Sequence, residues 1–216
     1  MTQQHFAILL GGAVEPTDRL RAQLAGCRTI AADGGMRHAL ALGLTPELWV
    51  GDFDSTDQTL INEWPQVVRQ PYPAAKNETD GEIAVGEAKA RGATSLTLVG
   101  ALGGERTDHA LAHLLMSLRL AEDGWSVMLT SGTEEAYPIL PGQHTIDLPD
   151  GSLFSVPGLT ALDALTLGNV GYPLTRFDLA FGSSRTISNI ARGPVRVSLD
   201  AGRAVLLARP HDFSGH

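Results

Sequence analysis

The feature that most constrains the fold is a regular alternation of short apolar runs with helical patterns along the first half of the chain. The apolar runs predict strands at residues 6–10, 29–32, 48–50, 66–69, 95–99 and 125–130, and helical patterns separate them at 16–25, before Gly43, after Ser55, at 79–91 and at 108–122. Ser55 and Gln58 are spaced as a capping box for the helix that follows them. Strands that alternate with helices indicate a mostly parallel sheet covered by helices on both faces, a three-layer α/β domain.

The pattern changes near Ser131, after which helical periodicity is weak. Short strand-like pieces at residues 144–146, 153–156, 164–167, 195–199 and 204–208 are separated by Gly, Pro, Asp and Asn. The last two flank Asp200-Ala201-Gly202 and are expected to form a hairpin. We therefore expect a small antiparallel β-sandwich after the α/β domain. The expected boundaries are residues 1–132 for the first domain, 136–210 for the second and 211–216 for a tail.

Composition excludes several classes of protein. The 216 residues are 43% hydrophobic, which suffices for one large or two small cores, and the formal net charge is −8 without a Lys/Arg cluster. A nucleic-acid binder needs a dense basic surface, so none is expected. The single cysteine, Cys27, forms neither an internal disulfide nor a zinc site. We find no secretory signal or membrane-spanning run and expect a cytoplasmic protein.

Unusual polar and glycine residues collect where three of the predicted strands end. They are Asp33-Gly34-Gly35, the segment from Gly51 to Ser55, and the segment from Gly100 to His109. In an open α/β sheet, ligands bind at the carboxyl ends of the strands. This clustering predicts a binding site there.

Asp52 and Asp54 lie two residues apart directly after a strand, so in extended backbone their side chains share a face. Two adjacent carboxylates repel each other, and a hard divalent cation removes that cost. The alternative is a solvated turn, since Asp, Gly and Ser are common turn residues. The similar loops on neighbouring strands favour a metal site.

The segment from Lys76 to Asp80 precedes a predicted helix. Thr79 or Asp80 is placed to cap that helix. Asp80 is also a candidate third metal ligand, and Lys76 a candidate phosphate ligand. Capping explains one of these polar residues, but not all of them.

The glycine-rich segment from Gly100 to His109 joins a strand to a helix. Its backbone N–H groups and the helix start suit an anion, and Arg106 can hold a phosphate through two hydrogen bonds. The segment is neither a Walker loop nor a GxGxxG dinucleotide loop. The alternative is a tight turn with Asp108 as the helix N-cap, and Asp108 can combine both roles.

Together these segments resemble the thiamine pyrophosphokinase family. The matching pieces are AADGG at 31–35, LGLTPELWVGDFDS at 42–55, ETD at 78–80, GALGG with RTDH at 100–109, and ISN at 187–189, in the family's order. This sequence departs from the family at Asn77 and Ile190, where acidic residues are common, at Glu105, which is inserted before Arg106, and at Arg37, where asparagine is common.

The resemblance implies an N-terminal nucleotide domain, a C-terminal β domain and a homodimer whose active sites lie where the subunits meet. It also implies that ATP donates diphosphate to thiamine with magnesium as cofactor, giving thiamine diphosphate and AMP. The implied roles are Asp52, Asp54 and Asp80 as magnesium ligands; Arg106 with the Gly103 and Gly104 amides as phosphate contacts; Asp108 in the metal shell or as acceptor of the hydroxyl proton; Asp33, Gly34, Gly35, Lys76 and Thr79 on the nucleotide or thiamine side; and Ser188 and Asn189 as thiamine contacts.

Other readings remain open. A phosphatase of the DxD type would use Asp52 as its nucleophile, although such proteins usually place this motif after the first strand rather than the third. A nucleotide or thiamine sensor without catalysis would use the same scaffold. An interaction module built on the sheet would leave the clustering at the strand ends unexplained.

Overall fold

A computed structural model describes residues 4–53, 56–73, 75, 77–104 and 106–214. The chain divides into two compact units. Unit 1 comprises Met1–Ala110 and Trp125–Gly132, and unit 2 comprises Leu111–Gly124 and Thr133–His216. Within the described residues, no helix is long and apolar enough to cross a membrane.

Unit 1 contains a parallel sheet with the strand order β4-β3-β2-β1-β5-β6. The strands are β1 (His5–Leu9), β2 (Arg28–Ala32), β3 (Leu48–Gly51), β4 (Val68–Pro71), β5 (Ser95–Val99) and β6 (Ser126–Thr130). Leu9 at the end of β1 pairs with Ala31 of β2 on one side and with Val99 of β5 on the other. The predicted α/β class with a mostly parallel sheet is confirmed.

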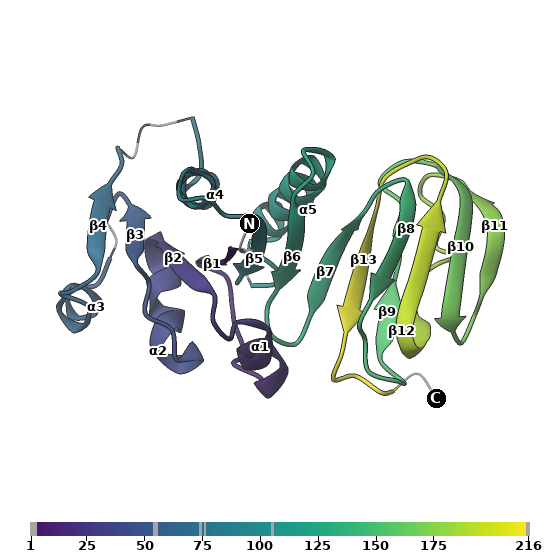
Figure 1. The fold of residues 1–216 in the computed structure, drawn as a ribbon, viewed down its shortest axis with the longest axis horizontal. Helices are drawn as coiled ribbons and strands as arrows, with labels where there is room; N and C mark the ends of the chain where they lie inside the picture. Colours follow the sequence, from purple (N-terminus) through teal and green to yellow (C-terminus); the bar gives the residue numbers. More distant parts are fainter. Residues whose placement is uncertain (1–3, 54–55, 74, 76, 105, 215–216) are drawn as a thin grey trace. The chain divides into compact units, whose positions relative to one another are not determined.

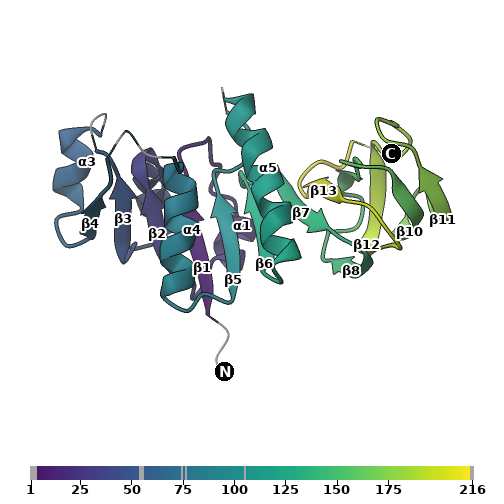
Figure 2. The same cartoon turned by 90° about the horizontal axis from the view of Figure 1, so that it is seen from above.

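Helices cover both faces of this sheet. They are α1 (Asp18–Gln23), the 3₁₀ helix η1 (Asp33–His38), α2 (Ala39–Leu42), α3 (Gln58–Glu63) and α4 (Asp80–Ala90). Figure 1 shows α4 on one face and α1 and α2 on the other, and in Figure 2 α4 lies along the strands. Alternate strand residues such as Leu9, Ala31 and Trp49 pack with Leu20 of α1 and Met36 of η1 into one buried cluster. This alternation follows from the period of two along a strand.

Some predicted boundaries in unit 1 are wrong. Asp57, not Ser55, caps α3, because its carboxylate accepts a hydrogen bond of 2.8 Å from the Thr59 N–H; Ser55 lies outside the described residues. The strand β4 starts at Val68 rather than at residue 66, since residues 64–67 form a turn closed by a bond from the Val67 N–H to the Trp64 carbonyl.

Helix α5 (Thr107–Glu122) has its first residues in unit 1 and the rest, from Leu111, in unit 2. It begins one residue earlier than expected. Asp108 therefore lies inside the first turn and is not the N-cap.

Unit 2 is antiparallel and holds the strands β7 (Glu135–Ile139), β8 (Gly142–Ile146), β9 (Leu153–Ser155), β10 (Leu162–Val170), β11 (Leu174–Leu179), β12 (Asn189–Leu199) and β13 (Ala204–Arg209). β7, β13, β9 and the start of β12 pair in one sheet. β8, β10 and β11 pair in a second sheet with the rest of β12. β12 passes from the first sheet, where Asn189 and Ile190 pair with β9, to the second, where pairing with β10 begins at Ala191. Side chains from both sheets form one buried cluster, which includes Phe154 and Val197.

The predicted hairpin of residues 195–199 with 204–208 is wrong, because β9 lies between β12 and β13. The turn between β12 and β13 is bound to other segments of unit 2. Ala201 forms a β-bridge with Asp163, and the Arg203 carbonyl accepts a hydrogen bond from the Leu159 N–H.

Candidate active site

The loops after β1 and β5 meet at the carboxyl end of the sheet in unit 1. The strand order reverses here, since the chain moves from β1 through β2, β3 and β4 on one side and then crosses to β5 on the other. In such sheets the crevice at the reversal is the usual ligand site. A Cβ on Gly12 would lie 2.2 Å from the Gly100 carbonyl oxygen, and one on Gly35 would lie 2.1 Å from the Leu9 carbonyl oxygen. Only glycine allows these backbones to approach so closely.

Arg37 and His38 hold the loop after β1. The Arg37 guanidinium donates from Nη2 to the carbonyls of Gly11 and Gly12. His38 Nε2 lies 2.8 Å from the Gly12 oxygen and must donate, because a carbonyl only accepts. Burial is the main cause that lowers the pKa of His38; the bond to Gly12 opposes it, and the charge of Arg37 adds the smallest, lowering effect. His38 therefore serves this loop as a neutral donor near pH 7.

Sequence reasoning missed this loop and its two anchors. The detectable signal was the pair Gly11-Gly12 directly after the first strand. It resembles the glycine pairs that were noted after β2 and in the segment after β5.

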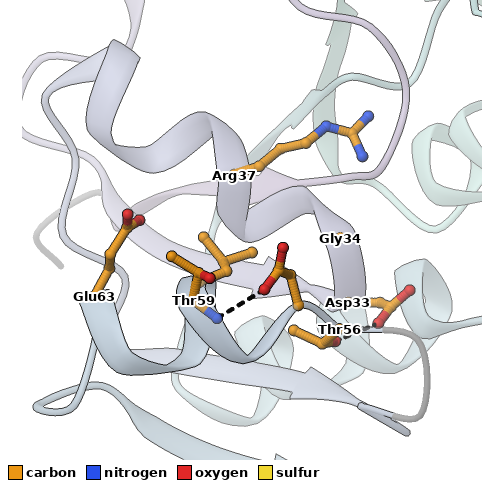
Figure 3. A pocket seen from close by; sticks show the side chains of 8 residues that line it. Asp33, Gly34, Arg37, Thr56, Thr59 and Glu63 are labelled. Carbon is orange, nitrogen blue, oxygen red and sulfur yellow. Dashed lines mark hydrogen bonds between the residues drawn. The ribbon is translucent and has the colours of Figure 1, made fainter.

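Asp33 is fixed in a left-handed backbone conformation with φ 44°, which is uncommon for a residue with a side chain. The Trp49 indole N–H donates to the Asp33 carbonyl at 2.8 Å, and the absence of a side chain at Gly51 leaves room for the Asp33 backbone. The Asp33 carboxylate accepts a bond of 3.4 Å from the Thr56 hydroxyl (Figure 3). Strained residues of this kind cluster at functional sites.

Asp33 lines an open hollow of about 400 Å³. Its walls come from η1 and from the start of α3: Asp33, Gly34, Arg37, Thr56, Asp57, Thr59, Leu60 and Glu63. Two of these residues, Asp33 and Gly34, were predicted from the sequence to lie on the nucleotide or thiamine side.

Asp52 follows β3 directly, and Asp80 is the first residue of α4; both are partly buried. Asp54 and Lys76 lie outside the described residues. Among the residues that are described, no three His, Cys, Asp or Glu side chains gather in a way that could hold a metal ion. The three-carboxylate magnesium site therefore stays a prediction.

Thr79 caps α4, as one of the two readings of this segment expected. Its hydroxyl accepts a bond of 3.2 Å from the Glu82 N–H, and the Glu82 carboxylate accepts one of 3.1 Å from the Thr79 N–H. This reciprocal pair is a capping box. Asp80 is thus placed in the first turn, at the positive end of the helix.

Arg106 and Asp108 form a two-pronged ion pair with each other. Arg106 Nε lies 2.9 Å from one Asp108 oxygen, and Nη2 lies 2.7 Å from the other. The hydrogen bond from Arg106 is the largest cause that holds the pKa of Asp108 far below its usual range. Asp108 is therefore a weak base while this pair is formed, which disfavours it as acceptor of a hydroxyl proton. Gly103 and Gly104 beside the pair are exposed, with φ of 72° and 90°.

In unit 2, the Asn189 side chain is buried and bonded to backbone. Its oxygen accepts from the N–H groups of Tyr172, at 3.0 Å, and Ile190, at 2.8 Å, while its nitrogen donates to the Tyr172 carbonyl at 2.9 Å. Ser188 is exposed, with φ 60°, and its N–H donates to the Ser155 hydroxyl at 3.0 Å. Asn189 thus holds the turn between β10 and β11, and Ser188 beside it is exposed.

Comparison with known proteins follows the same segments. Residues 25–129 match the family described as thiamin pyrophosphokinase, catalytic domain. None of the curated protein sequences matches the chain.

Several solved structures have the same fold. A thiamin pyrophosphokinase from Geobacillus thermodenitrificans is 26% identical with a TM-score of 0.82, over 99% of this chain and 100% of that one. The thiamine pyrophosphokinase from Bacillus subtilis is 21% identical with a TM-score of 0.85, over 97% and 100%. The thiamin pyrophosphokinase from Candida albicans is 13% identical with a TM-score of 0.78, over 95% and 90%. The similarity in fold thus extends over both units.

Proposed function

Because residues 25–129 belong to the thiamin pyrophosphokinase catalytic-domain family, we propose that the protein transfers diphosphate from ATP to the hydroxyl group of thiamine. The products are thiamine diphosphate and AMP. The observation that carries this proposal is the coincidence of two findings. The family match spans β2, β3 and β5 with the helices η1 and α4, and β5 is one of the two strands, with β1, between which the sheet order reverses.

In this reaction one bond forms and one bond breaks. The hydroxyethyl oxygen of thiamine attacks the β-phosphorus of ATP, and the bond from this phosphorus to the oxygen that bridges to the α-phosphorus breaks. AMP leaves with that oxygen, and the proton of the thiamine hydroxyl is released to water. Such a transfer depends mainly on alignment of the two substrates and on neutralisation of phosphate charge.

Asp52, Asp54 and Asp80 are the proposed magnesium ligands. Their carboxylate oxygens are the hard donors that magnesium takes, usually one or two per ion beside water and substrate phosphate. The described pair, Asp52 and Asp80, therefore suits this ion by its chemistry even without a cage of three protein ligands. When bound, the ion would neutralise phosphate charge and orient the triphosphate.

The remaining contacts belong to the same proposal. Arg106 and the amides of Gly103 and Gly104 would contact phosphate, and Arg106 has donors left beyond the two that Asp108 uses. Asp108 then orients Arg106. Asp33, Gly34, Gly35, Lys76 and Thr79 stay proposed for the nucleotide or thiamine side, although the Thr79 hydroxyl already serves the helix cap.

Ser188 and Asn189 stay proposed for the side of thiamine. The exposed hydroxyl of Ser188 is the better direct contact of the two, because Asn189 has one N–H left after its three backbone bonds. A homodimer with active sites at the subunit interface is part of the proposal. Light scattering tests it, since the dimer has twice the 22.9 kDa mass of the chain.

Separation of the products tests the function. The protein is incubated with ATP, magnesium and thiamine, and nucleotides and thiamine esters are separated by chromatography. Equal amounts of AMP and thiamine diphosphate support the proposal. ADP with thiamine monophosphate contradicts it, a phosphoenzyme trapped on Asp52 would indicate the phosphatase, and tight binding without turnover would indicate the sensor.

A further inference from the structure

We propose that Arg37 is a phosphate-binding residue of this site and contacts the triphosphate of ATP beside the glycine loops. The inference rests on the proposed function for the identity of the ligand. It adds a residue that neither the strand-end motifs nor the segments shared with the family include.

The first observation is the position of the Arg37 guanidinium. Arg37 comes from η1, which follows β2, and its Nη2 donates to two carbonyls in the loop after β1. A Cβ on Gly34 would lie 3.3 Å from Arg37 Nη1, so the lack of a side chain at Gly34 leaves room for the guanidinium. Arg37 therefore reaches from one strand end to the next at the carboxyl edge of the sheet.

The second observation is the contact between the loop after β1 and the glycine loop after β5. Gly12, which accepts from Arg37, is the residue whose Cβ would collide with the Gly100 oxygen. A Cβ on Gly104 would in turn lie 3.6 Å from the Ala13 nitrogen. The Arg37 guanidinium thus binds a loop that itself lies against the glycine loop after β5. Gly103 and Gly104 of that second loop are exposed.

The third observation is the charge of Arg37. Arg106 is paired with Asp108, whereas the partners of Arg37 are neutral carbonyls. Over the part of the chain that the structure describes, no carboxylate forms an ion pair with Arg37. Figure 3 draws no hydrogen bond between its guanidinium and the carboxylates of Asp33 and Glu63, which line the same hollow.

Five N–H donors are available in a guanidinium, and the two carbonyls occupy those of Nη2. The N–H groups of Nε and Nη1 remain, on different edges of the guanidinium plane, and can each donate to a separate phosphate oxygen. An exposed arginine whose charge meets only neutral carbonyls among the described residues, beside the glycine loops after β1 and β5, fits a polyphosphate better than a neutral ligand.

Binding measurements on variants test the proposal. Arg37→Gln keeps an amide donor for the carbonyls but removes the charge, and Arg37→Lys keeps the charge but removes the planar guanidinium with its several fixed donors. Affinities for magnesium α,β-methylene-ATP and for adenosine are measured by calorimetry. We expect Arg37→Gln to weaken the analogue roughly tenfold to a hundredfold, as for a lost hydrogen bond to a charged group, and Arg37→Lys to weaken it less. Adenosine, which has no phosphate, should bind as to the wild type.

Arg21→Gln is the matched control, because Arg21 is another arginine of unit 1 whose Nη2 donates to a backbone carbonyl, that of Ala41. It should leave both affinities unchanged. An analogue affinity within twofold of wild type in Arg37→Gln would overturn the proposal. Equal weakening of analogue and adenosine would also overturn it, since that is the result of a purely structural role.

A measurement on the wild-type protein covers the case in which Arg37→Gln does not fold. Phenylglyoxal modifies arginines, and mass spectrometry of peptides locates the modified residues. The analogue, but not adenosine, should slow modification of Arg37 several-fold while Arg21 reacts as before. Unchanged modification of Arg37 would contradict the proposal. Both measurements use binding alone, so failure of Arg37 as a ligand is distinguishable from absence of thiamine diphosphate formation.

Discussion

Asn189 illustrates how a single residue can match a binding motif and still work within the fold. The ISN motif implied that this side chain contacts thiamine, and the structure commits three of its hydrogen bonds to the backbone of Tyr172 and Ile190. Sequence could not reveal this commitment, because Tyr172 lies 17 positions away and its backbone carries no sequence signal. The adjacent Ser188 has its side chain exposed, as a binding residue would.

Replacement of Asn189 by Ala should destabilise the protein by about 2–4 kcal/mol. The substitution removes three bonds and leaves the N–H and carbonyl of Tyr172 without these partners. Urea unfolding followed by circular dichroism measures the loss. Ser188→Ala is the control and should change the free energy of unfolding by less than about 0.5 kcal/mol. A loss of the same small size in Asn189→Ala would show that its bonds do not stabilise the turn.

His38 predicts a pH dependence. Its pKa in the folded protein lies below the ordinary value of 6.5, so the unfolded chain binds more protons when the pH falls through that value. The contribution of His38 to stability is therefore fully present above pH 6.5 and decreases as the pH falls toward the lower folded pKa. Thermal melts between pH 7.5 and 5 should show a smaller acid loss in His38→Gln than in the wild type. Identical loss of stability in acid in the two proteins would argue against a contribution from His38. Burial also lowers the pKa of His5, so His5 supplies part of the acid loss that remains in His38→Gln.

At the scale of elements, the loops after β1, β2 and β5 form the candidate site through backbone contact. The glycines after these strands could be recognised from the sequence, because each parallel strand is a local apolar run whose end is visible in the sequence. It could not show which loops touch. That depends on β1 lying between β2 and β5, a consequence of the whole sheet.

Gly12→Ala tests this contact between loops. The added methyl group would meet the Gly100 carbonyl at 2.2 Å, so the loops after β1 and β5 must move apart. We expect a loss of about 1–3 kcal/mol in stability, as for overpacking, and at least a tenfold lower rate of AMP formation. Gly11→Ala is the control, because a Cβ there meets nothing within 4 Å. Equal behaviour of the two variants would mean that the loops tolerate separation.

At the scale of the molecule, the two units differ in how far sequence predicts them. In unit 1 every predicted strand is present, since period and flanking glycines are local signals. In unit 2 five strand segments were predicted, β7 and β11 were missed, and the pairing was wrong: β12 joins β8, β9 and β10 instead of forming a hairpin with β13. Alternating residues define the faces of a strand, not its neighbour, so distant antiparallel pairing stays open until the core is assembled.

The candidate site shows the same division. Motifs pointed to Asp33, Arg106 and Asp108 as candidates, but could not show the pairing of the latter two or the reach of Arg37 to the loop after β1. Those features depend on side-chain contacts between loops. The metal ligands rest on Asp54 as well, which lies outside the described residues.

The central claim is that carboxylates at the strand ends hold the divalent ion that makes diphosphate transfer possible. The most direct test is the steady-state rate of AMP formation from ATP and thiamine at saturating magnesium, in the wild type and in Asp54→Asn. The account predicts a folded variant, with an unchanged melting temperature, whose rate falls by at least about a hundredfold, as expected when charge stabilisation in a transition state is removed. A folded Asp54→Asn protein that releases AMP at the wild-type rate would contradict it.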